Sequence, residues 1–401
     1  MIDFEPLPTT KQARKGIHGM ALNVYRPIAR YYDDNEHEKV QELYDMAENM
    51  AKAARAAAEA KKDQPKPAEP RPKVKTEPGL SSVVVMEEMA WGDAGILLAN
   101  PGQGLGNAAI DAVATPEQKA RFGRKFAAMA ITEPGCGSDT AAVATTAKHD
   151  PDTNEWILNG EKIFVTSGGQ CEAAVVWATL DRSRGRSAIK SFVVEKGTPG
   201  MTVTKLEHKL GIRASDTASI VFEDCRIPYD NILGSPEIVE KTGLKGVMKT
   251  FDATRPAVAA MALGVSRAAL EFTKEKLEGE GFHFPYDKGP HELSHVQQTF
   301  LDMEANLEVA RLLVWRSAAM LDTGERNSLE ASQGKAKAGR SASLVTQKCV
   351  ELLGPLGYSR EWLVEKWMRD CKINDIFEGT GQIQMLVIAR IILGFNRDQL
   401  K

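Results

Sequence analysis

The chain has 401 residues and a formal net charge of −3, and 43% of its residues are hydrophobic. This length is enough for two or three domains with a large core. The nearly balanced charge argues against a nucleic-acid partner. No segment is long and apolar enough to insert into a membrane, and the acidic start has neither signal-peptide nor transit-peptide character.

The five cysteines are scattered along the chain, and no two of them form a CxxC pair. This spacing argues against a zinc site, so we expect no metal, and reduced thiols are the default state. A cytoplasmic protein fits this composition best.

The first part of the chain has a helical pattern from about Lys11 to Lys62. Within it, a second helix is expected to open at residues 34–38, with an apolar stripe over residues 40–46. Residues 62–78 are rich in Pro and Lys, which favours an extended and exposed linker. Helix is expected again over residues 81–98. Thr115-Pro116 is typical of an N-cap followed by proline.

From residue 131 to about 232 the pattern changes to alternating, β-branched runs that are typical of strands. Turn signals at Asn159-Gly160 and Pro199-Gly200 are expected to separate strands. This stretch predicts a mostly antiparallel β domain. The clearest strand signals are Glu155–Leu158, Lys162–Thr166, Ala174–Trp177 and Ser191–Val194.

Helical periodicity resumes near Val247, and the long segments Val296–Thr323 and Ser328–Leu353 suggest a helical bundle. We therefore predict an α+β protein in three parts. These are an N-terminal helical domain over 1–130 with the insert at 62–78, a β domain over 131–240 and a C-terminal helical domain over 241–401.

The most informative stretch is Ile376–Gln384. It precedes the apolar run Met385–Leu393, which predicts a buried helix that ends at Gly394. Thr380 is the expected N-cap of that helix. Glycines before the helix let a ligand approach the backbone closely, and the free amides of a helix start can bind an anion. Glu378 lies beside them after two apolar residues, and such surroundings raise a carboxyl pKa and suit it to accept a proton. The alternative is a solvated loop glutamate.

The segments Arg369–Ile373 and Ile376–Thr380 closely resemble the C-terminal motif of acyl-CoA dehydrogenases. In most of that family the glutamate at this position is the catalytic base, so the resemblance gives this role to Glu378. The order of helices, β domain and helices is also the order of that family's fold, which ends in a four-helix bundle.

Two further segments resemble the family's flavin-binding motifs. Ala130–Asp139 is similar to its first signature, and this similarity implies that Thr132 bonds the flavin ring, with Gly137 beside it, and that Ser138 lies between cofactor and thioester. Phe164–Gly169 resembles the flavin-facing strand. There Thr166 would bond the flavin near N5, and Phe164 replaces the usual tryptophan.

The segment around Phe251–Pro256 resembles the family's coenzyme A contact, which implies substrate-binding roles for Asp252 and Arg255. An arginine suits a phosphate or a pantetheine carbonyl. Arg326 matches another such arginine, although a solvated surface charge is the alternative for it.

Glu351–Tyr358 resembles the family's second signature, with Glu351 where glutamine is common. The resemblance implies that Glu351 and Gly354 contact the cofactor, and it gives the same role to Gly379, Thr380 and Gln382. No arginine occurs between Arg267 and Arg311, where the family usually has one that reaches the FAD of a neighbouring subunit. These departures concern the ADP half of FAD.

The resemblance implies an FAD-dependent enzyme that converts an acyl-CoA to its trans-2-enoyl-CoA. It also implies electron transfer to an electron-transferring flavoprotein and a homotetramer or homodimer. Two alternatives remain open: a related oxidase that uses oxygen, and a degenerate acyl-CoA-binding subunit without activity. The pattern does not indicate the length or branching of the acyl chain.

Overall fold

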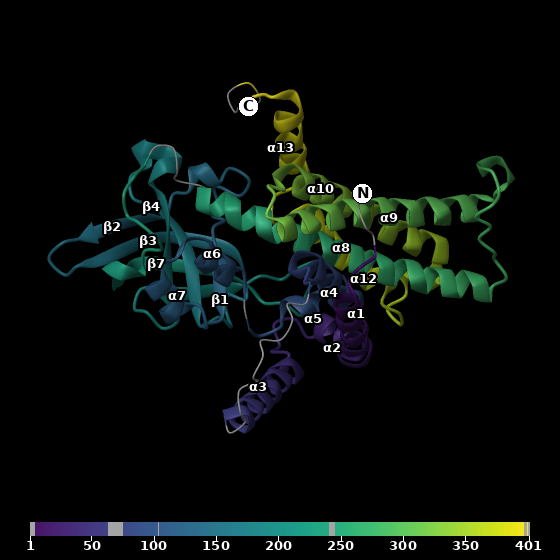
Figure 1. Cartoon of the computed structure of the whole chain (residues 1–401), viewed down its shortest axis with the longest axis horizontal. Helices are drawn as coiled ribbons and strands as arrows, with labels where there is room; N and C mark the ends of the chain where they lie inside the picture. Colours follow the sequence, from purple (N-terminus) through teal and green to yellow (C-terminus); the bar gives the residue numbers. More distant parts are fainter. Residues whose placement is uncertain (1–4, 63–74, 103, 240–244, 397–398, 400–401) are drawn as a thin grey trace.

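The computed structural model describes residues 5–62, 75–102, 104–239, 245–396 and 399 (Figure 1). Most of the predicted insert, residues 63–74, therefore lies outside the described residues. The N-terminal part is helical, as predicted. Its helices are α1 (Pro8–Met20), which continues through the π-helical turn η1 (Ala21–Tyr25) into α2 (Arg26–Asp34), then α3 (Gln41–Lys62), α4 (Pro78–Gly92), α5 (Ala94–Leu98), α6 (Leu105–Val113) and α7 (Pro116–Phe122).

Two boundaries in this part differ from the prediction. Asp34 ends α2 rather than opening the next helix, which begins only at Gln41. The helix expected over residues 81–98 is broken at Asp93, whose extended backbone and side-chain carboxylate cap the separate helix α5. The predicted N-cap at Thr115 is confirmed, because its hydroxyl accepts a hydrogen bond from the amide of Gln118.

The middle of the chain forms one seven-stranded sheet in the order β1-β4-β2-β3-β7-β6, with β5 also paired to β4. The pairs of β1 and β2 with β4 are parallel and the other four are antiparallel, so the mostly antiparallel prediction is confirmed. The strands are β1 (Ala127–Ala130), β2 (Thr146–Asp150), β3 (Glu155–Thr166), β4 (Ala173–Thr179), β5 (Ile189–Glu195), β6 (Met201–Leu206) and β7 (Thr217–Pro228).

Strand β4 is buried on both faces because alternate side chains enter two different cores. Val176 packs with Trp156 and Phe222 on one face, and Trp177 packs on the other, where Ile110 of α6 also lies. The sheet is thus fixed between two apolar layers.

The turn predicted at Asn159-Gly160 is wrong. Both residues lie inside β3, which runs unbroken from Glu155 to Thr166 and changes register against β7 between Leu158 and Gly160. Gly160 has a φ of 152°, and a Cβ there would lie 2.5 Å from the Thr145 hydroxyl. A glycine in a strand marks either a turn or such an irregularity, and the pairing with β7 decides for the second.

The C-terminal part is a helical bundle, and the predicted segments match the long helices α9 and α10 closely. The N-terminal helices share its core, since Tyr25 and Trp91 belong to the same apolar cluster as Phe300 and Trp367. The elements are α8 (Lys245–Gly279), α9 (His295–Thr323), α10 (Ser328–Leu353), α11 (Pro355–Tyr358), α12 (Val364–Cys371), the 3₁₀ turn η6 (Lys372–Asp375) and α13 (Gly381–Leu393).

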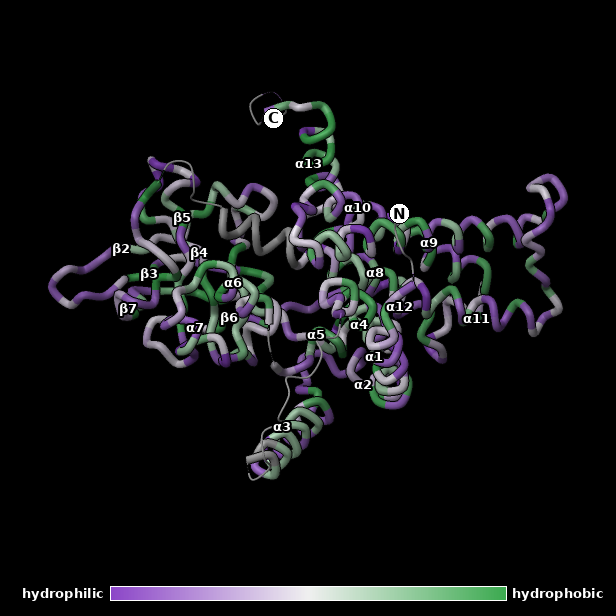
Figure 2. The backbone as a smooth tube through the Cα atoms, viewed as in Figure 1, coloured by the Kyte–Doolittle hydropathy of each residue, from purple (hydrophilic) through white to green (hydrophobic). Residues whose placement is uncertain are grey.

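Helix α13 begins after Thr380 and ends before a left-handed Gly394, as predicted, but the prediction that it is buried is wrong. It stands away from the bundle as a mainly hydrophobic segment (Figures 1 and 2). Only Gln384 of this helix is buried. Its large apolar side chains with more than a third of their surface exposed are Met385, Leu386, Ile391, Ile392 and Leu393.

In the part of the chain that the structure describes, no helix combines the length and apolar character needed to cross a membrane. All five cysteines are buried with free thiols.

Candidate active site

Residues 376–380, between η6 and α13, form a loop that we call the Glu378 loop. Its backbone has an unusual conformation that the local sequence makes possible. Glu378 has a φ of 56° and Gly379 a φ of 90°, so two successive residues are left-handed. A Cβ on Gly379 would collide with the side-chain amide of Gln384. Thr380 then caps α13, since its hydroxyl accepts a hydrogen bond of 3.2 Å from the Ile383 amide. The glycine and the cap therefore fix where the glutamate leaves the loop.

The carboxylate of Glu378 is partly buried and accepts a hydrogen bond of 3.1 Å from the Thr254 hydroxyl of α8. Burial raises the pKa of Glu378 above its ordinary value, although Thr254, Lys335 and Arg255 act in the opposite direction. A carboxylate with a raised pKa accepts a proton more readily than a solvated one. The environment thus has the character that the sequence predicted.

Lys335 is a residue of this site that the sequence reasoning missed. It lies on α10, is only 1% exposed, and donates hydrogen bonds to the carbonyls of Asn374 at 2.6 Å and Gly379 at 3.3 Å. Burial lowers the pKa of Lys335 to about 8, against the opposing charges of Asp375 and Glu378. The signal in the sequence was weak: a lysine surrounded by small residues on a long helix.

Arg255 and Arg326, which were both predicted to contact coenzyme A, lie in different elements of the fold. Arg255 is 4% exposed on α8, and its charge acts on that of Glu378, so the structure brings these two predicted residues together. The side chain of Asp252 lies outside the described residues. Arg326 is exposed in the loop between α9 and α10, where its Nε donates to the Ser328 hydroxyl at 3.1 Å.

A second group of predicted residues meets at the end of β3. The amide of Ile163 donates to the Thr132 carbonyl at 2.9 Å, which places the loop of the first signature beside this strand. Phe164 is 60% exposed with a φ of 55°, and the pairing of β3 with β7 shifts register there. Thr166 follows, half-buried, at the strand end. An exposed aromatic ring is thus presented next to two threonines.

This group fits a flavin ring. Within the described part of the chain, no side-chain hydrogen bond engages the hydroxyls of Thr132, Ser138 or Thr166, so all three can still bond a ligand. Gly137 and Ser138 are exposed, and a Cβ on Gly137 would meet only the Thr132 methyl group, at 3.9 Å. The Phe164 ring offers a flat apolar surface. The donors and the ring suit a planar, hydrogen-bonding cofactor.

A buried ion pair holds this loop in place. The ammonium group of Lys162 on β3 is fully buried and donates to the Glu133 carboxylate at 2.7 Å and to the Ile131 carbonyl at 3.0 Å. Glu133 also accepts bonds from the amide and the hydroxyl of Thr145. These bonds fix the loop that carries Thr132 to strand β3.

Other predicted cofactor residues lie apart from Glu378. Glu351 is exposed and paired with Lys348 at 2.7 Å, and Gly354 ends α10 with a φ of 54°. Glu351 follows Lys335 by sixteen residues, which is about 24 Å along a helix. Gln382 is exposed on the first turn of α13. The structure thus does not bring Glu351 and Gly354 to the Glu378 loop of the same chain.

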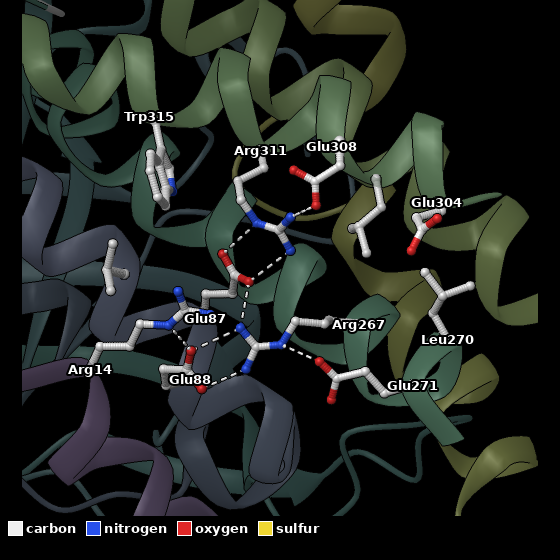
Figure 3. A pocket seen from close by; sticks show the side chains of 12 residues that line it. Arg14, Glu87, Glu88, Arg267, Leu270, Glu271, Glu304, Glu308, Arg311 and Trp315 are labelled. Atoms are coloured by element: carbon white, nitrogen blue, oxygen red, sulfur yellow. Dashed lines mark hydrogen bonds and ion pairs between the residues drawn. The ribbon is translucent and has the colours of Figure 1, made fainter. Parts of the chain in front are cut away.

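A cavity of about 430 Å³ lies elsewhere, between α1, α4, α8 and α9 (Figure 3). Most of its charged side chains are paired with one another. Arg267 donates to the buried carboxylates of Glu87 and Glu88, both at 2.8 Å, and Arg311 contacts Glu87 at 3.0 Å. Although burial acts against it, Arg267 and Arg14 hold the pKa of Glu88 at about 2. We interpret this network as a junction between helices.

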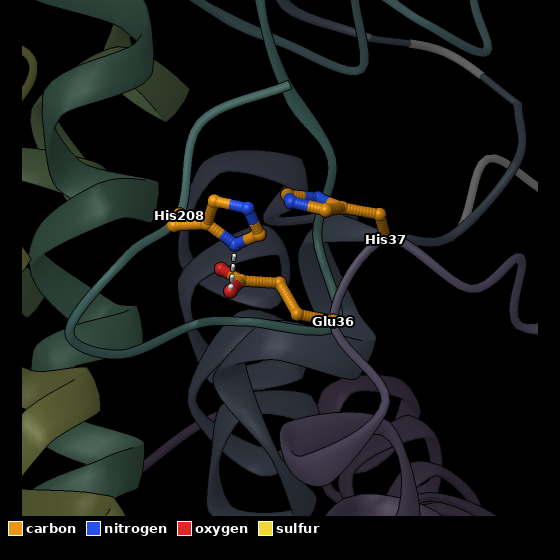
Figure 4. A group of neighbouring side chains, drawn as sticks. All are labelled: Glu36, His37 and His208. Atoms are coloured by element: carbon orange, nitrogen blue, oxygen red, sulfur yellow. Dashed lines mark hydrogen bonds and ion pairs between the residues drawn. The ribbon is translucent and has the colours of Figure 1, made fainter. Parts of the chain in front are cut away.

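Glu36, His37 and His208 form another cluster, whose ligand atoms lie within 4.8 Å of one another (Figure 4). His208 Nδ1 is 3.0 Å from the Glu36 carboxylate. Lys209 and Arg213 are also within 3.6 Å of that carboxylate. Because a divalent cation would face these two positive charges, we interpret the cluster as a clasp between the N-terminal helices and the loop before β7.

The chain runs from an N-terminal helical part through a β sheet to a helical bundle, and the Glu378 loop precedes its last helix. This order defines the acyl-CoA dehydrogenase fold. Two solved structures share it with a TM-score of 0.81 and 30% sequence identity, covering 98% of this chain and 100% of each. One is the butyryl-CoA dehydrogenase from Megasphaera elsdenii, and the other is described as the electron transferring flavoprotein of Acidaminococcus fermentans.

Family models agree with this fold: "Acyl-CoA dehydrogenase, middle domain" matches residues 128–225 and "Acyl-CoA dehydrogenase, C-terminal domain" matches residues 241–393. The short-chain specific acyl-CoA dehydrogenase of Bos taurus is 39% identical over 324 residues, which are 78% of this chain and 76% of that protein. The chain therefore belongs to the acyl-CoA dehydrogenase family.

The same enzyme of Rattus norvegicus is 41% identical over 272 residues, which cover 68% of this chain and 64% of the rat protein. The match to this relative thus spans slightly less than two thirds of its length.

Proposed function

We propose that the chain is an FAD-dependent dehydrogenase of acyl-CoA thioesters. In this reaction the substrate loses a proton from its α-carbon and a hydride from its β-carbon, and the product is a trans-2-enoyl-CoA. FAD, when bound, supplies the acceptor for the hydride. The observation that carries the proposal is Glu378, a partly buried carboxylate with a raised pKa at a glycine-rich helix start.

The residues of this chain have separate tasks in the proposal. Glu378 takes the α-proton. Its own backbone amide donates to no acceptor in the described part of the chain, so it can bond the thioester oxygen and help to acidify the α-carbon. Arg255 adds positive charge next to the site and would contact the coenzyme A portion. Thr132, Ser138, Phe164 and Thr166 would hold the flavin ring.

We propose a short acyl chain as substrate and an electron-transferring flavoprotein as electron acceptor. The first rests on the relatives named as short-chain specific enzymes and on the butyryl-CoA dehydrogenase structure. The second rests on the match to a structure described as an electron transferring flavoprotein. The five free thiols are compatible with a reducing, cytoplasmic location.

The proposed function is tested with the purified full chain and FAD. We expect a yellow protein whose flavin is bleached by butyryl-CoA without oxygen, more slowly by long-chain acyl-CoAs, and with crotonyl-CoA as the product. In air, little hydrogen peroxide should form without an added electron carrier. A colourless protein that FAD cannot reconstitute would favour the degenerate subunit, and rapid peroxide formation would favour the oxidase.

We also propose that the chain works as a homo-oligomer, a tetramer or a dimer. Two observations support this: α13 exposes an apolar surface, and Glu351 and Gly354 lie far along α10 from the Glu378 loop, where they would serve the FAD of a neighbouring subunit.

A charge on α13 should disrupt this assembly. Ile392, which is 62% exposed, is the suitable position. We expect Ile392→Glu to lower the mass measured by analytical ultracentrifugation and to reduce bound FAD, because an apolar contact cannot accept an unpaired charge. The matched control is Ala57→Glu on the exposed helix α3. A monomeric wild-type protein that retains FAD would contradict the proposal.

A further inference from the structure

Lys335 lies on the face of α10 that meets the Glu378 loop. Its Nζ is within hydrogen-bond distance of the carbonyls of Asn374 and Gly379, which are on either side of the glutamate. One helical turn further on, a Cβ on Gly339 would lie 2.8 Å from the same Asn374 carbonyl. Helix α10 therefore approaches the loop closely through a glycine and bonds it through a lysine.

We propose that Lys335 is a positioning residue for Glu378. Its ammonium group ties the loop to α10 on both sides of the glutamate and places a positive charge beside the carboxylate. The assignment of Glu378 as the base rests on the proposed function, whereas the contacts of Lys335 do not depend on it.

The first task of Lys335 is to hold a strained backbone. A left-handed conformation is unfavourable for a residue with a Cβ, and Glu378 adopts it. The side-chain amide of Gln384 donates to the carbonyls of Glu378 at 3.3 Å and Gly379 at 3.2 Å, and Lys335 donates to the second of these. A buried carbonyl that loses its donor is unfavourable. Lys335 and Gln384 together keep the carboxylate aimed in one direction.

The second task of Lys335 is electrostatic. The charged groups that act on it come from three elements: Asp375 of η6, Glu378 of the loop and Arg255 of α8. The ring of Phe377 lies 5.9 Å from its Nζ. Below about pH 8 Lys335 carries its proton, and its charge favours the ionised form of Glu378. Removal of this charge should raise the pKa of Glu378 further, so that the base stays protonated to higher pH.

The test measures the protonation of Glu378 directly in the flavoprotein without substrate. Infrared difference spectra between each protein and its Glu378→Gln derivative, recorded across pH, follow the carboxyl band of Glu378. We expect its titration to move up by at least ~1 pH unit in both Lys335→Gln and Lys335→Met, the usual effect of losing a nearby opposite charge. Lys335→Arg should stay closer to wild type.

Lys337→Met is the matched control. Lys337 lies on the same helix but donates to Asn306 of α9, at 2.6 Å. It should leave the titration of Glu378 unchanged. Lys335 is also expected to affect flavin reduction mainly below neutral pH, where a raised pKa removes the ionised base. A structural role alone would lower the rate equally at every pH.

The two neutral variants keep the test decisive if one of them does not fold. Glutamine can still donate to the carbonyls that Lys335 bonds, whereas methionine cannot, so the two variants disturb the loop differently while both remove the charge.

An unchanged titration of Glu378 in the neutral Lys335 variants that fold overturns the inference. The result is separate from the proposed function. If the titration shifts but no acyl-CoA reduces the wild-type flavin, Lys335 positions Glu378 and the proposed function fails. If wild type reduces its flavin but the titration does not shift, the function stands and the inference fails.

Discussion

Lys366→Met is expected to lower the free energy of unfolding by about 3–5 kcal/mol, the usual result of removing one partner of a buried ion pair. Lys366, Asp93 and Asp370 are all fully buried. The ammonium group of Lys366 bonds both carboxylates, at 2.5 Å in the case of Asp370. Without it, the two buried carboxylates would face each other, and within the described residues no other positive side chain is hydrogen-bonded to either of them.

This triad joins the three parts of the fold, so its loss should affect all of them. Asp93 caps α5 through the Ile96 amide at 2.9 Å, and Asp370 accepts the Ile212 amide of the β domain at 2.5 Å. Although burial alone would lower it, the two carboxylates raise the pKa of Lys366 above its usual range. Lys366 therefore keeps its proton to a higher pH than an exposed lysine would.

Urea unfolding at a fixed FAD concentration measures this effect, and its pH dependence gives a second check. In the folded variant both carboxyl pKa values should lie above their unfolded values. The variant should then lose stability as pH rises. Its free energy of unfolding should therefore fall short of the wild-type value by less near about pH 5 than near about pH 8. Lys52→Met on the exposed helix α3 should change stability by less than about 0.5 kcal/mol. A Lys366→Met protein as stable as wild type would contradict the assignment.

Features with local causes were predictable from the sequence. The hydroxyl of Thr380 and the left-handed Gly394 mark the two ends of α13, and both signals act within one turn of the helix. The same holds for the N-cap at Thr115 and for the bounds of α10. The raised pKa of Glu378 was also predicted, but its cause is less local than expected, because Ile376 is 48% exposed and the groups that act on the carboxylate come from α8 and α10.

Features that depend on distant partners were not predictable. Asn159-Gly160 has the composition of a hairpin turn. In the structure, β7 pairs with β3 on both sides of these two residues, so they form an irregularity within one strand. The apolar run of α13 indicates that the helix is covered, but not whether its own chain covers it. In the sequence, Lys335 and Lys337 look alike, because both stand next to small residues on the same helix. Only the position of the Asn374 carbonyl against α10 distinguishes them.

Glu378→Gln is expected to reduce the rate of flavin reduction by substrate at least ~10²-fold, the low end for the loss of a positioned general base. Glutamine retains the size and polarity of the side chain and can still bond the Thr254 hydroxyl. The left-handed backbone at residue 378 is equally accessible to both residue types. The variant should therefore fold, bind FAD and bind acyl-CoA, and lose only the proton acceptor.

The measurement that tests the central claim most directly is anaerobic rapid mixing of wild type and Glu378→Gln with butyryl-CoA, followed by the visible absorbance of the flavin. Binding of the substrate to the variant is measured in parallel by the perturbation of the same spectrum. The proposed role of Glu378 predicts normal binding and bleaching slowed by at least ~10²-fold. Bleaching of the variant at the wild-type rate would show that another group takes the α-proton.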